Sequence, residues 1–170
     1  PGPSLSAIIQ LGSVFALVWY FRSDIFKLRT TSSIKISDLL IHKSLLVSIF
    51  ISTIPIVLLG GTIKLFIPNF FYNSLRSNLS IGLVSFLMAI FMYIADNSGK
   101  GIINLKNHKY SSSFLIGLSQ AFAIFPGFSR SGVTISTARI LGWERGDAAK
   151  FSFLIGIPAI SLAAIVEFIS

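Results

Sequence analysis

The stretch that decides the fold of this chain is Pro126-Gly127-Phe128-Ser129-Arg130-Ser131-Gly132-Val133-Thr134. It is a polar turn with a single cation, and it lies between two apolar segments. The glycines permit backbone conformations with positive φ, and the hydroxyls can donate hydrogen bonds. A helix that begins inside such a turn presents free backbone N–H groups, which bind anions. The stretch therefore predicts an anion site at a break between apolar helices.

The composition places this turn in a membrane protein. The chain has 170 residues, of which 53% are hydrophobic and 12% charged, and its mean hydropathy is +0.80. Soluble domains carry about 25% charged residues. The net charge of +8 comes mainly from short loops, so membrane topology explains it better than nucleic acid, for which no basic stripe with aromatic residues is present. The absence of cysteine excludes disulfides and thiolate sites.

We predict an all-α, polytopic membrane protein that forms a single domain over residues 1–170. Apolar runs predict membrane-spanning helices at residues 5–21, 44–66, 79–95 and 151–169. The apolar segments 111–125 and 133–141 are too short for a crossing, which takes about 20 residues. Two short segments around a Gly/Pro-rich break are typical of a broken helix that lines a cavity. We therefore expect a re-entrant helix pair around the turn.

Loop charge predicts the orientation of this helix pair. Basic residues concentrate in the loops before the second and after the third predicted span: Arg22, Lys27, Arg29, Lys35, Lys43, Lys100, Lys106 and Lys109. The loop between these two contains Arg76, with Lys64 at its border. The positive-inside rule places the two basic loops in the cytoplasm. Segment 111–125 then runs outward, and the turn faces the outer side of the membrane.

Arg130 carries the strongest functional signal in the turn. An arginine at mid-membrane costs about 2.5–3.5 kcal/mol by insertion scales, so its retention calls for a reason. Its planar guanidinium can bind phosphate in a bidentate manner. The alternative is an arginine that anchors a helix end at the membrane interface. The flanking serines and glycines favour the phosphate site.

The hydroxyl groups of the turn have more than one interpretation. Ser129 and Ser131 could donate hydrogen bonds to phosphate, or one of them could be a nucleophile, which needs a base. His42 and His108 lie in the loops assigned to the cytoplasm, and we interpret both as solvated loop residues. Thr134 could face the same pocket or cap a helix that starts there, and the two roles are compatible.

The acidic residues do not complete an active site. Asp96 ends an apolar run, which indicates a structural role, and Glu144 with Asp147 fits a solvated turn or helix start better than a metal site. We predict no metal ligands, and we find no Walker A motif and no nucleotide fingerprint. Phosphate-ester hydrolysis normally uses a metal or a general base. The chain by itself therefore lacks some of the groups that phosphate-ester hydrolysis needs.

Residues 126–134 resemble the PGxSRSGxT motif of the undecaprenyl-diphosphate phosphatases, the BacA/UppP family. The resemblance extends to the GLxQA segment at residues 117–123 and to the FSFL and IPAI segments at residues 149–154 and 157–160. Residues 9–13 are similar to the family's IQLG segment, and residues 20–22 to the aromatic-basic helix end that follows it. Residues 22–79 match by pattern rather than by motif.

This resemblance implies an enzyme of the bacterial cytoplasmic (inner) membrane. Such an enzyme hydrolyses undecaprenyl diphosphate to undecaprenyl phosphate and inorganic phosphate, which recycles the lipid carrier of cell-wall synthesis and confers bacitracin resistance. The fold implied is all-helical with inverted repeats and re-entrant helices. Whether the protein forms a homodimer is left open. The resemblance places catalytic roles on Arg130, Ser129 and Ser131, and substrate binding on three further residues: Gly127, Gly132 and Thr134.

One departure from the family pattern is large. The family's acidic segment and Ser-Ser-Thr-Gly-His stretch would lie before Ile9, with catalytic glutamates, a histidine and a requirement for divalent metal (Mg or Ca), and residues 1–7 do not contain them. We therefore expect the middle part of a longer protein, inactive alone, with the metal ligands elsewhere. A polyprenyl-phosphate carrier or flippase is the alternative function, because broken helices also serve transport. A purely structural membrane subunit would leave Arg130 unexplained.

Overall fold

A computed structural model describes residues 3–22, 36–66 and 77–169. Their helices are α1 (Pro3–Tyr20), α3 (Ile36–Phe66), α5 (Asn78–Ser98), α6 (Tyr110–Ser119), α7 (Arg130–Ile140) and α8 (Arg145–Ile169), with a short 3-10 helix, η1 (Gln120–Ile124), after α6. Within these ranges the β-type pairing is an isolated bridge between Ile103 and Trp143. The all-α prediction is confirmed.

In the part of the chain that the structure describes, three helices are long and apolar enough to cross a membrane: residues Lys43–Thr62 of α3, Asn78–Ser98, which is all of α5, and Arg145–Val166 of α8. The apolar part of α1, Ile8–Tyr20, is shorter. Many large apolar side chains point outward, such as Leu79 and Phe86 on α5, which are 85% and 64% exposed. An apolar exterior of this kind suits a lipid environment rather than water. The chain is thus a membrane protein with several candidate spans.

The predicted spans coincide with α1, α3, α5 and α8, but two helices start earlier than their apolar runs. α3 begins at Ile36, inside the predicted basic loop, and α8 begins at Arg145 rather than near residue 151. Asp147 in the first turn of α8 accepts a hydrogen bond from the backbone N–H of Leu105 at 2.9 Å. A carboxylate at a helix N-terminus is favourable, so polar residues extend α8 past its apolar part.

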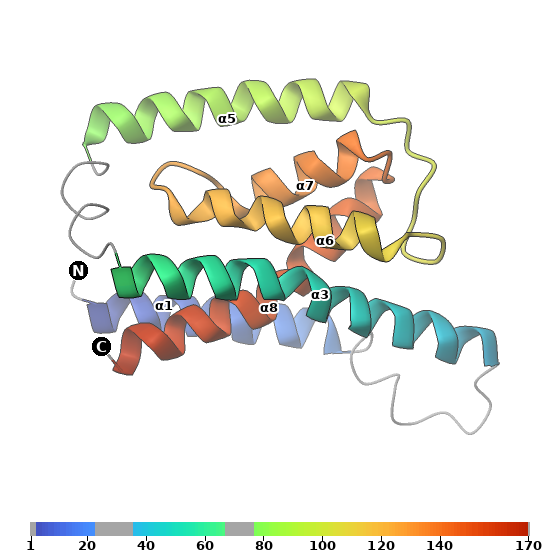
Figure 1. Ribbon diagram of the computed structural model, residues 1–170, viewed down its shortest axis with the longest axis horizontal. Helices are drawn as coiled ribbons and strands as arrows, with labels where there is room; N and C mark the ends of the chain where they lie inside the picture. Colours follow the sequence, from blue (N-terminus) through green and yellow to red (C-terminus); the bar gives the residue numbers. More distant parts are fainter. Residues whose placement is uncertain (1–2, 23–35, 67–76, 170) are drawn as a thin grey trace.

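The long helices enclose a hairpin of two short ones (Figure 1). α1, α3 and α8 pack on one side, α5 lies on the opposite side, and α6 and α7 lie between them, with direct contacts between α3 and α6, α5 and α7, and α7 and α8. α6 and α7 run antiparallel, so the hairpin starts and ends near the segment that follows α5 (Figure 1). Its tip, residues 125–129, lies at the other end.

The base of the hairpin is held by a buried core. Trp143 and Phe151 are fully buried, with ring centroids 5.1 Å apart, and they pack with Ile116 of α6. The backbone N–H groups of residues 102 and 103 both donate to the carbonyl of Gly142 at 2.9 Å. Gly142 has a φ of +89°, a conformation that glycine adopts without strain. These contacts fix where α7 ends and α8 begins.

Close packing also fixes α6 against α3. A Cβ on Gly117 would overlap the backbone of Ser52, so only glycine permits this approach. The Ser52 hydroxyl donates to the carbonyl of Ser113 at 2.6 Å, and the Gln120 amide donates to the carbonyl of Ser52 at 3.1 Å. Small and polar residues at a helix contact are typical of membrane proteins, where they allow backbones to approach and hydrogen-bond. The GLxQA-like segment thus anchors the hairpin.

Candidate anion-binding site

The tip of the hairpin is a tight turn that packs on α5. Gly127 has a φ of +96°, and a Cβ there would lie 2.9 Å from both the carbonyl oxygen of Ile81 and the Cβ of Val84. The Ser85 hydroxyl donates to the Gly127 carbonyl at 3.2 Å. Glycine is therefore required at this position by both backbone conformation and space. The contact fixes the turn that precedes α7.

Ser129 begins α7. Its backbone is extended (φ −82°, ψ 117°), and its hydroxyl oxygen accepts the N–H of Gly132 at 3.2 Å, which is N-capping geometry. The hydroxyls of Ser129 and Ser131 lie 3.5 Å apart. Gly132 is buried, and a Cβ on it would lie 3.1 Å from the sulfur of Met92. The two serines therefore meet at the positive end of the α7 dipole.

Arg130 is the first helical residue of α7, and its guanidinium packs on α8. A Cβ on Gly156 would lie 2.6 Å from Nη1 and 2.7 Å from Nη2 of Arg130. Nη1 is buried and has no hydrogen-bond partner among the described residues. Burying a cation without a partner costs free energy, because the cation loses its hydrogen bonds to water and no hydrogen bond to the protein replaces them. The guanidinium can therefore accept an anionic ligand without breaking a bond to the described part of the chain.

Thr134 lies one turn further along α7 and is 1% exposed. Its Oγ1 is 3.0 Å from the carbonyl oxygen of Arg130 and 2.6 Å from the hydroxyl oxygen of Ser152 on α8. Of the two roles considered for Thr134, capping is excluded, because Ser129 caps the helix and α7 starts at Arg130. The sequence did not show this because glycine and serine in the first turn do not resemble an apolar helix start. The hydroxyl of Thr134 points to α8.

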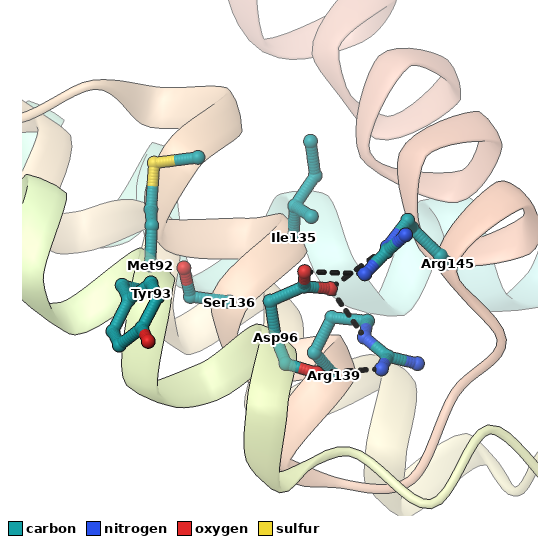
Figure 2. A pocket seen from close by; sticks show the side chains of 7 residues that line it. All are labelled: Met92, Tyr93, Asp96, Ile135, Ser136, Arg139 and Arg145. Atoms are coloured by element: carbon teal, nitrogen blue, oxygen red, sulfur yellow. Dashed lines mark hydrogen bonds and ion pairs between the residues drawn. The ribbon is translucent and has the colours of Figure 1, made fainter.

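A separate pocket of about 340 Å³ lies at the base of the hairpin, between α5, α7 and the start of α8 (Figure 2). Asp96 lies at its edge and pairs with two arginines: Arg139 Nε at 3.3 Å and Arg145 Nε at 2.9 Å from Oδ1. The structural role predicted for Asp96 fits these contacts. Because both guanidiniums already bond to oxygen atoms of the protein, this pocket offers an anion fewer free donors than Arg130 does.

Arg139 is a residue whose importance the sequence analysis missed. It is 7% exposed and donates to three backbone carbonyls, those of Trp143 at 2.6 Å, Asp96 at 2.8 Å and Gly99 at 3.1 Å. These bonds join the end of α7 to the end of α5 and to the start of α8. The available signal was an arginine inside an apolar segment, which is usually buried with partners.

His108 is not the solvated loop residue that we predicted. Its Nε2 lies 2.7 Å from the Ser48 hydroxyl of α3 and its Nδ1 lies 2.9 Å from the Leu105 carbonyl. Its ring packs 5.2 Å from that of Trp143. Burial lowers the pKa of His108, and the hydrogen bond to Leu105 opposes this shift in part. His108 therefore belongs to the hairpin base, opposite the tip, and the side chain of His42 lies outside the described residues.

The described side chains do not assemble a metal centre. No group of three or more His, Cys, Asp or Glu residues among them lies close enough to hold a metal ion. Asp147 is engaged with the Leu105 backbone, as expected for a helix start. These residues alone thus do not fit a divalent cation.

The fold and the tip together define a class: a helical membrane protein with a candidate anion site at the tip of a helical hairpin. The chain belongs to the family described as bacitracin resistance protein BacA, whose model matches residues 2–170.

Three relatives of this chain share the name undecaprenyl-diphosphatase. The chain is 78% identical over 170 residues to the undecaprenyl-diphosphatase of Prochlorococcus marinus strain MIT 9312, covering 100% of the chain and 63% of that protein. It is 74% identical over 170 residues to the protein of the same name from strain AS9601, covering 100% of the chain and 62% of that protein. The undecaprenyl-diphosphatase of Trichodesmium erythraeum is 43% identical over 174 residues, covering 98% of the chain and 54% of the relative. The chain spans less than two thirds of the length of these relatives.

Proposed function

We propose that the protein containing this chain hydrolyses undecaprenyl diphosphate to undecaprenyl phosphate and inorganic phosphate. Membership of the BacA family and the name shared by relatives up to 78% identical support this function. The observation that carries it is the buried Nη1 of Arg130 at the N-terminus of α7, which has no hydrogen-bond partner within the described residues. A diphosphate headgroup supplies the negative charge that this position lacks.

In this proposal Arg130 binds phosphate oxygens and offsets the charge that builds up on them. Guanidinium–phosphate bonds are charge-assisted and directional. They can therefore stabilise the negative charge that develops on the phosphate oxygens during the reaction. The hydroxyls of Ser129 and Ser131 and the backbone N–H groups of the first turn add donors at the same end of α7. Water attacks the terminal phosphorus: its oxygen forms a new P–O bond while the P–O bond to the bridging oxygen breaks, its proton passes to a base, and the bridging oxygen leaves with the lipid phosphate.

The two serines act as hydrogen-bond donors rather than as nucleophiles in this scheme. A serine nucleophile needs a base, and within the described residues these hydroxyls contact each other and the N–H of Gly132. His108 lies at the opposite end of the hairpin. The base, and the ligands of the divalent metal that the resemblance implies, would come from residues other than those described.

The proposal also gives the hairpin a place in the membrane. α6 and α7 have 10 and 11 residues, too few for a crossing each, and they enter and leave at the same end of the molecule (Figure 1). We propose that they form the re-entrant pair predicted from the sequence, with the tip open to the outer side. Inverted repeats and a homodimer remain part of the proposal that rests on resemblance.

The test uses the full-length protein in detergent micelles, with undecaprenyl diphosphate as substrate and phosphate release as readout. We expect Arg130→Ala to lower kcat/KM at least about a hundredfold, as for loss of a group that stabilises transition-state charge. Arg130→Lys should recover only part, because lysine lacks the planar fork. Arg145→Lys, an exposed arginine at the hairpin base, is the matched control and should be unaffected.

Unchanged turnover in Arg130→Ala would remove Arg130 from the site. If the wild-type protein released no phosphate but moved a polyprenyl phosphate across vesicle membranes, the carrier function would replace the proposed one.

A further inference from the structure

α8 packs against the α7 residues of the predicted site through two small residues, Ser152 and Gly156. They lie one turn apart, and both are buried. Ser152 meets Thr134, with 2.6 Å between the hydroxyl oxygens, and Gly156 lies against the guanidinium of Arg130. Arg130 and Thr134 are also one turn apart, on α7. The same faces of two helices therefore make both contacts.

Proton accounting assigns the direction of the hydroxyl pair. Thr134 Oγ1 is within 3.0 Å of the Arg130 carbonyl and 3.1 Å of the Ser131 carbonyl, and a carbonyl can only accept. A hydroxyl has one hydrogen, so when Thr134 donates to its own helix, Ser152 must donate to Thr134. The bond is buried, with Ser152 3% and Thr134 1% exposed, so no water competes for either group. Without Thr134, the Ser152 hydroxyl would lose its hydrogen-bond partner among the described residues; without Ser152, Thr134 would keep the bond to its own helix but lose the bond that joins α7 to α8.

We propose that Ser152 is a positioning residue of the phosphate site, which through Thr134 fixes the position of α7 on α8 and so holds the Arg130 guanidinium in place against Gly156. This inference rests on the proposed function. It also explains why the FSFL-like segment, which contains Ser152, accompanies the turn in the sequence although it contributes no group to the tip.

The geometry links the bond to the guanidinium. Arg130 packs on α8 at a position without a side chain, so no Cβ limits how far the guanidinium can move along α8. Near Arg130, the described residues of α7 and α8 are joined by the hydrogen bond between Thr134 and Ser152. Catalytic groups must be held within about 0.5 Å of their working geometry, and a shift of about 1 Å can cost a hundredfold in rate.

The test compares four variants of the full-length protein: Ser152→Ala, Thr134→Val, the double variant and Ser152→Thr. The measurements are KM and kcat with undecaprenyl diphosphate, and the inhibition constant of inorganic phosphate. We expect Ser152→Ala and Thr134→Val each to raise KM and the inhibition constant about three- to tenfold. The double variant should lose no more than either single variant, because both remove the same bond. Ser152→Thr keeps a hydroxyl and should restore the wild-type values.

Ser161→Ala is the matched control. Ser161 lies on α8 as well, and its hydroxyl donates within the helix to the Ile157 carbonyl at 2.7 Å. We expect its kinetic constants to be unchanged. A variant that merely folds poorly would lower the amount of active enzyme with KM and the inhibition constant unchanged, which separates a positioning role from a structural one.

Additive losses in the double variant, or unchanged KM in both single variants, would overturn the inference. If the wild-type protein is active, Arg130→Ala is inactive and Ser152→Ala behaves as wild type, this inference fails while the proposed function stands. If the wild-type protein releases no phosphate, the proposed function fails as well.

Discussion

Replacing Arg139 by methionine removes the cation that joins the ends of α5 and α7 to the start of α8. The substitution keeps a long side chain but leaves the carbonyls of Trp143, Asp96 and Gly99 without the donor that now lies 2.6–3.1 Å from each. Hydrogen bonds to a charged group contribute about 1.5–3 kcal/mol each, and bonds to one side chain are not additive. We expect the free energy of unfolding to fall by about 3 kcal/mol.

The assay is unfolding of the full-length protein in mixed micelles by increasing fractions of sodium dodecyl sulfate, followed by far-ultraviolet circular dichroism. Arg145→Met is the matched control, because Arg145 contacts the same carboxylate of Asp96 but its side chain is 74% exposed. Exposed ion pairs contribute little. We expect the control to lose much less stability than Arg139→Met. Equal losses in the two variants would refute the reasoning, since they would show that the shared ion pair, not the buried carbonyl bonds, holds the helices.

Three further predictions concern the hairpin. Gly117→Val should destabilise the protein more than Gly82→Val. A side chain at position 117 would overlap the Ser52 backbone, whereas a Cβ on Gly82 meets nothing within 4 Å. Equal unfolding midpoints of the two variants would contradict the close α3–α6 contact. Gly127→Ala should lower phosphate release, because the positive φ and the contact with α5 both exclude a side chain, and unchanged kinetics would show that the tip adapts. Because burial lowers the pKa of His108, the unfolded chain binds the proton more readily, so stability is constant above about pH 6.5 and falls as the pH drops through the lowered value. His108→Asn should remove this part of the acid sensitivity when unfolding midpoints are compared at about pH 7 and about pH 5.

Local sequence was enough to predict the helices and the turn. Long apolar runs bounded by polar loops predict α3, α5 and α8, because a chain in lipid must satisfy its backbone hydrogen bonds within each segment. The Gly/Pro-rich break between two short segments predicted the hairpin's turn, and in the structure α7 begins at that break with the hydroxyls of Ser129 and Ser131 3.5 Å apart. These features depend on residues within a few positions of one another.

Only the tertiary structure decided which distant residues meet. Thr134 and Ser152 are 18 positions apart, Arg139 and Asp96 are 43 apart, and Ser48 and His108 are 60 apart. Each pairing depends on which faces of two helices pack together, and neither hydropathy nor local spacing carries that information. For the same reason the sequence alone left two roles open for Thr134 and led to a wrong role for His108 as a solvated residue. Sequence thus determined the helices and the chemistry of the turn, and packing determined which residues hold that turn in place.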